Sequence, residues 1–183
     1  MTKIMGILNV TPDSFSDGGN YIDLEQAVRH AKQLVADGAD AIDVGGESTR
    51  PGAAFVSAAE EIERVVPVIR RLKRELDVLV SIDTYKPDVA EAAVRAGADI
   101  INDVWGSKWG DCSMVNVAAH YDVPIILMHN RLEPHGPDML AEVRADLEDS
   151  IRLAKQAGVS ENQIWLDPGI GFMKTHQENL FLM

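Results

Sequence analysis

A polar loop at residues 9–19, with the sequence NVTPDSFSDGG, holds the first side chains that could do chemistry. It combines hydroxyls, carboxylates, one aromatic residue, Phe15, and a Gly-Gly pair. Loops of this kind can close over a charged ligand. Residues of the same types also mark ordinary solvated turns. The ligand-binding interpretation is favoured because polar segments of similar character recur at regular intervals along the chain.

The recurring polar residues lie at or just past the ends of successive apolar segments. They are Asn9, Asp43 with Glu47, Asp83, Asn102, His129 and Asp167. If each apolar segment is a parallel strand, a closed barrel brings the residues after all the strands to one mouth. A doubly wound sheet would concentrate only the residues at its switch point. Because every strand contributes a polar residue, the pattern favours an α/β barrel.

The segments that must position these residues alternate between strand and helix patterns. Apolar runs predict strands at 4–10, 41–44, 78–82, 100–101, 125–128 and 164–166. Helical periodicity predicts helices at 23–37, 57–75, 87–96, 112–121 and 137–157, with another beginning at residue 177. Strands that are apolar throughout are typical of parallel strands covered on both faces.

The helix expected at 57–75 illustrates how its ends and its buried side are predicted. Ser57 and Glu60 have the spacing of a capping box at its start. Its apolar periodicity predicts a buried side formed by Ile62, Val65, Val66, Ile69 and Leu72. Gly38 and Gly97, which follow two other helices, are expected to form left-handed caps that return the chain to the sheet.

Composition limits the class of protein. The chain has 183 residues, a net charge of −12 and one cysteine, Cys112. This length is typical of one domain with a sizeable core. The acidic balance argues against a nucleic-acid surface and against anionic membranes. A single cysteine excludes an intrachain disulfide, and neither a signal peptide nor a transmembrane run is recognised, so we expect a cytoplasmic protein.

Six motifs, in order along almost the whole sequence, resemble those of the dihydropteroate synthase family. They are 5–19 (MGILNVTPDSFSDGG), 43–52 (DVGGESTRPG), 81–84 (SIDT), 101–104 (INDV), 127–129 (LMH) and 167–174 (DPGIGFMK). The first two together are highly specific. The resemblance implies a (βα)8 TIM barrel and a transferase of folate biosynthesis. Enzymes of this family condense 6-hydroxymethyl-7,8-dihydropterin diphosphate with 4-aminobenzoate to give 7,8-dihydropteroate and diphosphate.

The resemblance also implies a pterin pocket. Asp167 would accept two parallel hydrogen bonds from the exocyclic amine and a ring N–H of the pterin. Asp83 would stabilise positive charge that spreads over the ring as diphosphate leaves. Asn102 would offer a donor and an acceptor to ring heteroatoms. The expected apolar walls are Val104, Ile126, Met128 and Phe172.

The diphosphate and the amine are expected to bind at the rim. By resemblance, Asn9 contacts a magnesium ion that the substrate phosphates largely hold. Thr49 and Arg50 would reach the diphosphate and the aminobenzoate, and the loops closing over the amine would include Phe15, Asp17 and Pro51. The implied mechanism is SN1-like: diphosphate leaves, and the neutral aniline nitrogen then attacks the methylene carbon. The residues assigned to catalysis are Asn9, Asp17 and Asp83.

Each of these residues also has a plainer interpretation. Carboxylates such as Asp83 and Asp167 often cap the helix after a strand. Apolar residues such as Met128 are usually core. A histidine beside a strand, here His129, is more often a hydrogen-bonded structural residue than a base, and we leave it out of the catalytic set. Cys112, expected on a helix, should be inert.

The sequence departs from the family's pattern at its end. The family's barrel has eight strands, whereas six are predicted here before Met183. We therefore expect a single barrel domain over residues 1–183 that is incomplete at its C-terminus, with little synthase activity on its own. Lys174 is not assumed to replace the pterin-binding lysine that the family's later strands supply. The resemblance implies that the full-length protein is a homodimer.

Two other functions remain open from the sequence. A methyltetrahydrofolate-binding methyltransferase shares the pterin-binding barrel, but it has no diphosphate to bind with the loops at 9–19 and 43–52. A non-catalytic pterin-binding fragment is compatible with the absent strands.

Overall fold

A computed structural model describes residues 2–11, 20–48 and 54–183. Its strands are β1 (Met5–Asn9), β2 (Ala41–Gly45), β3 (Leu79–Asp83), β4 (Ile100–Asp103), β5 (Ile125–Met128) and β6 (Ile164–Asp167). Its helices are α1 (Asn20–Ala36), α2 (Ala58–Glu75), α3 (Pro87–Ala96), α4 (Met114–Tyr121), α5 (Met139–Ala157) and α6 (His176–Leu182), with a 3-10 helix, η2 (Glu161–Gln163), before β6. Every strand and helix predicted from the sequence is present, and the ends differ by at most three residues.

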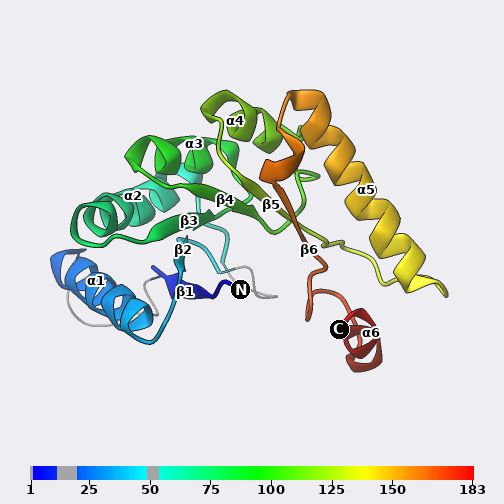
Figure 1. Ribbon diagram of the computed structural model, residues 1–183, viewed down its shortest axis with the longest axis horizontal. Helices are drawn as coiled ribbons and strands as arrows, with labels where there is room; N and C mark the ends of the chain where they lie inside the picture. The colour runs from blue at the N-terminus through cyan, green and yellow to red at the C-terminus, as the bar shows by residue number, and fades with distance from the viewer. Residues whose placement is uncertain (1, 12–19, 49–53) are drawn as a thin grey trace. The chain divides into compact units, whose positions relative to one another are not determined.

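The chain forms two compact units, Met1–Ile101 and Asn102–Met183, and the boundary between them falls within β4. In the first unit β1, β2 and β3 run parallel, with Asn9 opposite Gly45 and Gly45 opposite Asp83. The helices of this unit pack on one face of these strands (Figure 1). Gly6 allows this packing at β1, because a methyl group added there would lie 3.2 Å from Leu34 of α1.

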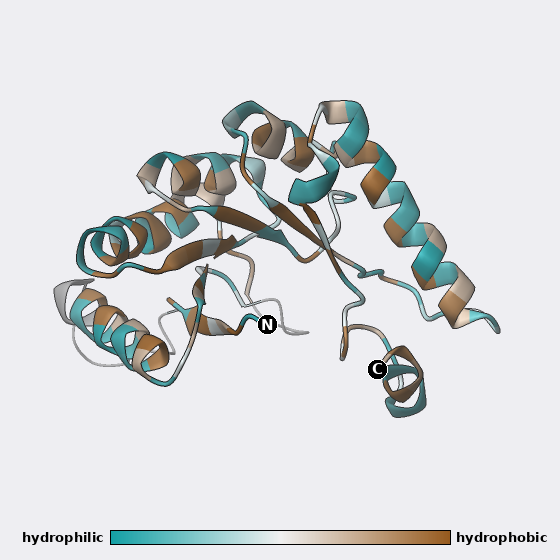
Figure 2. Ribbon diagram, viewed as in Figure 1, coloured by the Kyte–Doolittle hydropathy of each residue, from teal (hydrophilic) through white to brown (hydrophobic). Residues whose placement is uncertain are grey.

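The core of the first unit lies between these strands and their helices. Leu8, Val44 and Ile82, one from each strand, point toward the helices and are fully buried. Figure 2 shows the apolar residues gathered along the strands and along one side of the neighbouring helices. The prediction that the strands are covered on both faces is wrong for β1, because Ile7 on the opposite face is 65% exposed.

Helix α2 shows which local predictions were correct. Ser57 caps it, since its hydroxyl accepts a hydrogen bond from the N–H of Glu60 at 3.2 Å. The reciprocal half of the expected capping box is replaced by an ion pair between Glu60 and Arg64. Its buried residues are Glu61, Val65, Val68, Ile69 and Leu72, so the predicted burial of Ile62 and Val66 is wrong and that of the other three is confirmed.

The second unit carries β5 and β6 as a parallel pair, with Met128 opposite Asp167. Helix α5 packs against both strands (Figure 1). Trp165 of β6 is 42% exposed, so β6 is not covered on both faces either. Cys112 precedes α4 in a left-handed conformation with φ 60°, so the prediction that it lies on the helix is wrong.

The predicted left-handed caps are present at Gly38 and Gly97, with φ values of 107° and 114°. Gly158 ends α5 in the same way. A different kind of cap opens α6, where Thr175 and Glu178 form a complete capping box. Among the residues that the structure describes, none of the helices is both long and apolar enough to cross a membrane.

Candidate active site

Two of the predicted site residues form a row across the first unit. Asn9 ends β1, Gly45 ends β2 and Asp83 ends β3, and the parallel register places these three positions side by side. Successive side chains of a strand point to opposite faces. Because Leu8, Val44 and Ile82 point toward the helices, Asn9 and Asp83 point to the other face. The predicted placement of these two residues at strand ends is confirmed within this unit, and their role in a binding site stays a prediction.

Gly45 leaves an open position between the two polar side chains. A methyl group added at Gly45 would lie 3.4 Å from Asn9 Oδ1 and 3.4 Å from Asp83 Oδ2. Both oxygens therefore face the same small space above the end of β2. One row deeper on this face, the partners Asp43 and Ser81 are buried. On β2 and β3 this face is therefore polar, whereas β1 contributes the exposed Ile7 beside Asp43. Buried polar side chains suit a polar ligand better than a packed apolar core.

Glu47 has a different role from the one its position suggests. Its carboxylate accepts a hydrogen bond from the N–H of Val56 at 3.1 Å and forms an ion pair with Lys86. Lys86 also pairs with Glu61 of α2, which is 1% exposed. Glu47 therefore links Val56, just before α2, to Lys86, just before α3. Its carboxylate is occupied by these contacts and is not free to bind a ligand.

Lys86 stays charged in this buried network. Burial disfavours its charge, but hydrogen bonds to the two glutamates outweigh that penalty and raise the pKa of Lys86 above its ordinary value. The ammonium also lies 4.8 Å from the ring centre of Tyr85 and 5.3 Å from that of Phe55. Aromatic faces favour a cation at such distances. Sequence reasoning missed Lys86 and Glu61, because charged residues are expected at the surface.

In the second unit, β5 and β6 present a mixed apolar and acidic face. Ile126 and Met128 alternate with the fully buried Ile125 and Leu127, so they share the face opposite to α5. Met128 lies beside Asp167 in the register. This face therefore joins a carboxylate to apolar side chains, which is the combination predicted for a flat heterocycle with polar edges.

The end of β4 is organised by Asp103, next to the predicted ligand residue Asn102. The carboxylate of Asp103 accepts hydrogen bonds from the N–H groups of Trp105 and Ser107 at 2.9 and 2.7 Å. Burial nevertheless raises the pKa of Asp103 to about 6. Val104 beside it is buried, and its role as a wall of the pocket stays a prediction. Asn102 itself is half-buried.

The loop that follows Asp167 is tightly folded. Asp167 Oδ1 accepts a hydrogen bond from the N–H of Gly169 at 2.7 Å, and the N–H of Phe172 donates to the carbonyl of Gly169 at 3.1 Å. The Nζ of Lys174 donates to the carbonyls of Gly169 and Phe172 at 2.8 and 3.0 Å. Lys174 is thus bound into its own loop.

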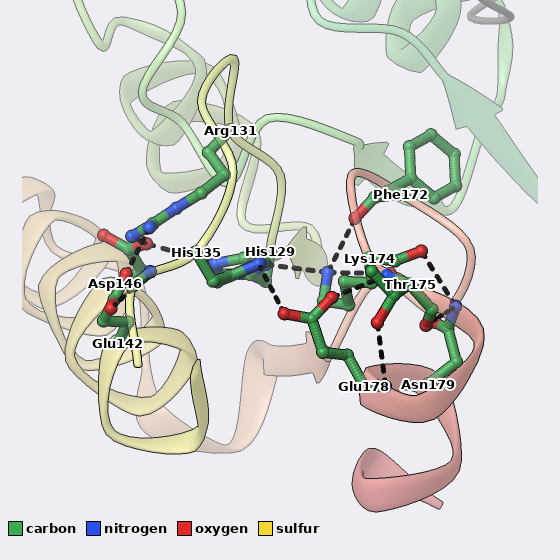
Figure 3. A network of polar contacts seen from close by, with 12 residues as sticks. His129, Arg131, His135, Glu142, Asp146, Phe172, Lys174, Thr175, Glu178 and Asn179 are labelled. Atoms are coloured by element: carbon green, nitrogen blue, oxygen red, sulfur yellow. Dashed lines mark hydrogen bonds and ion pairs between the residues drawn. The ribbon is translucent and has the colours of Figure 1, made fainter. Parts of the chain in front are cut away.

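His129 is buried and hydrogen-bonded, as the sequence predicts. It is 2% exposed, and both ring nitrogens have partners: Nε2 lies 3.1 Å from Asp146 and Nδ1 lies 3.0 Å from Lys174 (Figure 3). Burial and the charge of Lys174 lower the pKa of His129 to about 4, against the opposing effect of Asp146. The ring is therefore neutral at pH 7 and is not a strong base.

Several predicted site residues lie outside the described part of the chain. They are Phe15, Asp17, Thr49, Arg50 and Pro51. Their roles remain predictions from the sequence.

A magnesium ion fits the donor set of the first unit as a substrate-held ion. Among residues 2–11, 20–48 and 54–183, no three His, Cys, Asp or Glu side chains are grouped so that they could hold a metal. The amide oxygen of Asn9 is a hard donor that faces the open position at Gly45, close to the carboxylate of Asp83. Mg²⁺ is commonly held by one or two such oxygens together with water and substrate phosphates.

Comparison with known proteins decides the family. A family model described as pterin binding enzyme matches residues 5–183. The chain belongs to the pterin-binding enzyme family. Two curated relatives within this family are the dihydropteroate synthases of Bacillus subtilis and Clostridium beijerinckii, 58% and 56% identical over 182 residues. All of this chain aligns with them, and it covers 64% and 67% of their respective lengths.

Solved structures of pterin-binding enzymes agree with the fold. A dihydropteroate synthase from Clostridium difficile, in the presence of pteroic acid, is 49% identical with a TM-score of 0.95, over 99% of this chain and 69% of that one. A Xanthomonas albilineans synthase with 4-aminobenzoic acid is 46% identical with a TM-score of 0.92, over 98% and 66%. A Yersinia pestis synthase in a sulfonamide drug complex is 41% identical with a TM-score of 0.87, over 98% and 67%. These similarities confirm the predicted fold class, an α/β chain of six βα units from a TIM barrel.

Proposed function

We propose that this chain supplies the pterin-binding part of a dihydropteroate synthase. The observation that carries the proposal is the identity of 56–58% to named synthases over the whole chain. The chain spans about two thirds of the length of these relatives. The reaction would join 4-aminobenzoate to 6-hydroxymethyl-7,8-dihydropterin diphosphate, with release of diphosphate.

Asp167 is proposed to orient the pterin. One carboxylate oxygen is held by the N–H of Gly169 at 2.7 Å, which fixes the direction of the group. A fixed carboxylate can accept two roughly parallel hydrogen bonds from an amine and an adjacent ring N–H. Met128, beside it in the sheet, and Ile126 on the same face provide apolar surface for the ring. Asn102, Val104 and Phe172 are proposed to complete the contacts of the pterin.

Asp83 and Asn9 are proposed to act on the leaving group. Loss of diphosphate leaves positive charge on the pterin, so a carboxylate at Asp83 stabilises the transition state more than the ground state. Bound Mg²⁺ would neutralise the departing diphosphate, with Asn9 as its protein ligand. The shared orientation of Asn9 and Asp83 toward Gly45 supports assigning both to this end of the reaction.

The two loops outside the described residues are proposed to receive the second substrate. Thr49, Arg50 and Pro51 would contact the diphosphate and the aminobenzoate, and Phe15 and Asp17 would close over the amine. In this mechanism the aniline nitrogen attacks after diphosphate has left, so the enzyme needs no nucleophile. Sulfonamides, which resemble 4-aminobenzoate, are expected to compete for the same loops. We further propose that the full-length protein acts in the cytoplasm as a homodimer.

The proposal is tested by assaying the purified protein with both substrates and magnesium, and detecting 7,8-dihydropteroate by mass spectrometry. Calorimetry should show that pterin diphosphate binds in a magnesium-dependent manner and that its binding increases the affinity for 4-aminobenzoate. A pterin binder without synthase activity would give the first binding event and not the second. Transfer of a methyl group from methyltetrahydrofolate, with no condensation product, would contradict the proposal.

A further inference from the structure

A chain of polar contacts in the second unit connects α5 to the loop that carries Asp167 and Phe172. Asp146 of α5 contacts His129, His129 contacts Lys174, and Lys174 contacts the carbonyls of that loop (Figure 3). All of its members are described by the structure. The three side chains that form these contacts, Asp146, His129 and Lys174, are not among the residues proposed above to touch substrate.

The contacts fix the protonation pattern of the chain. Lys174 Nζ has three acceptors within 3.0 Å: the carbonyls of Gly169 and Phe172 and Nδ1 of His129. An ammonium has three N–H donors and no acceptor, so it satisfies all three partners. Nδ1 of His129 must then be the acceptor, and its proton must lie on Nε2. That N–H donates to Asp146 at 3.1 Å.

Asp146 anchors the other end of the chain. Its carboxylate also accepts from Lys108 at 3.0 Å and from Arg131 at 2.7 Å. Burial alone would raise the pKa of Asp146, but the hydrogen bonds from these two cations lower it to about 2. Asp146 is therefore a permanent acceptor near neutral pH, and it holds the imidazole of His129 in one orientation.

The backbone of the loop depends on the same contacts. The N–H of His129 donates to the carbonyl of Asp167 at 2.8 Å. Gly169, with φ 70°, lies so close to His129 that an added methyl group would sit 2.0 Å from its carbonyl oxygen. Lys174 closes the turn from the other side by binding the carbonyls of Gly169 and Phe172.

We propose that Lys174, oriented by His129 and Asp146, is a positioning residue that holds the Asp167 loop in its pterin-binding conformation. This inference rests on the proposed function, since it takes Asp167 as the pterin ligand. Lys174 acts through the backbone: its three bonds set the turn that places the N–H of Gly169 on Asp167 Oδ1. Its own ammonium is fully used and does not contact the ring.

The test compares variants of the purified protein by calorimetric titration with 6-hydroxymethylpterin. Lys174→Met is expected to weaken pterin binding at least tenfold. The matched control is Lys155→Met, which removes an exposed lysine paired with Glu161 in the same unit and should leave the affinity within twofold. His129→Leu should resemble Lys174→Met, whereas His129→Gln, which keeps one acceptor and one donor, should recover most of the affinity.

A spectroscopic measurement separates this role from general destabilisation. Nitrogen-15 spectra of the histidine rings should show a neutral His129 protonated at Nε2 at pH 7. The charged and titratable groups that face this ring are Asp146, Lys174 and His135, and Asp146 is itself paired with Lys108 and Arg131. In Lys174→Met the nearest cation is gone, so the pKa of His129 should rise from about 4.

The outcomes are distinguishable. Wild-type binding of the pterin together with unchanged affinity in Lys174→Met would overturn the positioning role and leave the proposed function standing. Failure of the wild-type protein to bind any pterin would overturn the proposed function, and the positioning role with it. Should Lys174→Met not fold, the comparison of His129→Gln with His129→Leu decides, and equal affinities in these two variants would refute the inference.

Discussion

Replacement of Lys86 by methionine should destabilise the first unit severely at neutral pH. The substitution keeps an unbranched side chain of similar length but removes the cation that pairs with both Glu47 and Glu61. Glu61 is 1% exposed, so its carboxylate has almost no access to water. Removing one partner of a buried ion pair typically costs about 3–5 kcal/mol of unfolding free energy.

The loss of unfolding free energy also follows from the free energy needed to protonate one of the two glutamates. Two carboxylates left together in a buried site relieve their repulsion when one of them is protonated. A glutamate of ordinary pKa, about 4.3, costs about 3.7 kcal/mol to hold protonated at pH 7, at 1.36 kcal/mol per pH unit. At pH 5 the same cost is only about 1 kcal/mol. The raised folded-state pKa in the variant therefore favours folding at low pH, and this contribution is lost as the pH rises.

The assay is urea unfolding of the wild-type protein and of Lys86→Met at pH 5 and pH 7. We expect a loss of about 3–5 kcal/mol at pH 7 that shrinks by roughly 2–3 kcal/mol at pH 5. Lys155→Met, which removes an exposed ion pair, should cost less than about 1 kcal/mol at either pH. A loss in Lys86→Met as small as that of the control, or one independent of pH, would refute the buried network.

Two further predictions concern the strand ends. Burial raises the pKa of Asp103 to about 6, so its contribution to stability is complete below pH 3.8 and is lost as the pH rises through 6, by about 3 kcal/mol. Asp103→Asn cannot ionise, but it loses one acceptor for an N–H group, so it should be less stable than the wild type at pH 4. The difference in unfolding free energy, measured with urea, should shrink toward pH 7. A difference that grows with pH would contradict this. Gly45→Ala should change stability by no more than about 1 kcal/mol, because the new methyl group makes ordinary 3.4 Å contacts. It fills the space faced by Asn9 and Asp83, so pterin diphosphate affinity should fall about tenfold, and unchanged affinity in calorimetry would remove this row from the site.

The strands and helices were predictable from the sequence because their signals are local. Continuous apolar runs marked all six strands, and glycines marked the ends of helices such as α3. The coverage of the strands was not predictable. Whether Ile7 or Trp165 is buried depends on what lies over the sheet, and an apolar run has the same appearance in either case.

The buried side of α2 was only partly predictable. Val65, Val66, Val68 and Ile69 follow one another so closely that their spacing fits more than one helical stripe. In the structure the buried side of α2 includes Val68 and also Glu61. A hydrophobic pattern would not predict a glutamate on the buried side. That burial is possible because Lys86, twenty-five positions away in the sequence, supplies the opposite charge.

The placement of Asn9 and Asp83 at strand ends was predictable from the sequence, whereas the polar contacts around His129 were not. Asn9 and Asp83 fall at equivalent positions of β1 and β3, on either side of β2, as their place after apolar runs implies. The partners of His129 lie 17 and 45 positions away in the sequence, at Asp146 and Lys174. No local pattern joins residues so far apart, although the prediction that His129 is hydrogen-bonded is confirmed.

Calorimetric titration of 6-hydroxymethyl-7,8-dihydropterin diphosphate into Asp83→Asn and Asp167→Asn measures whether the carboxylates at the ends of β3 and β6 bind the pterin. Hydrogen bonds to charged groups contribute about 1.5–3 kcal/mol each, so we expect each variant to lose roughly 10- to 100-fold in affinity without a change in melting temperature. Wild-type affinity in both variants would contradict the account.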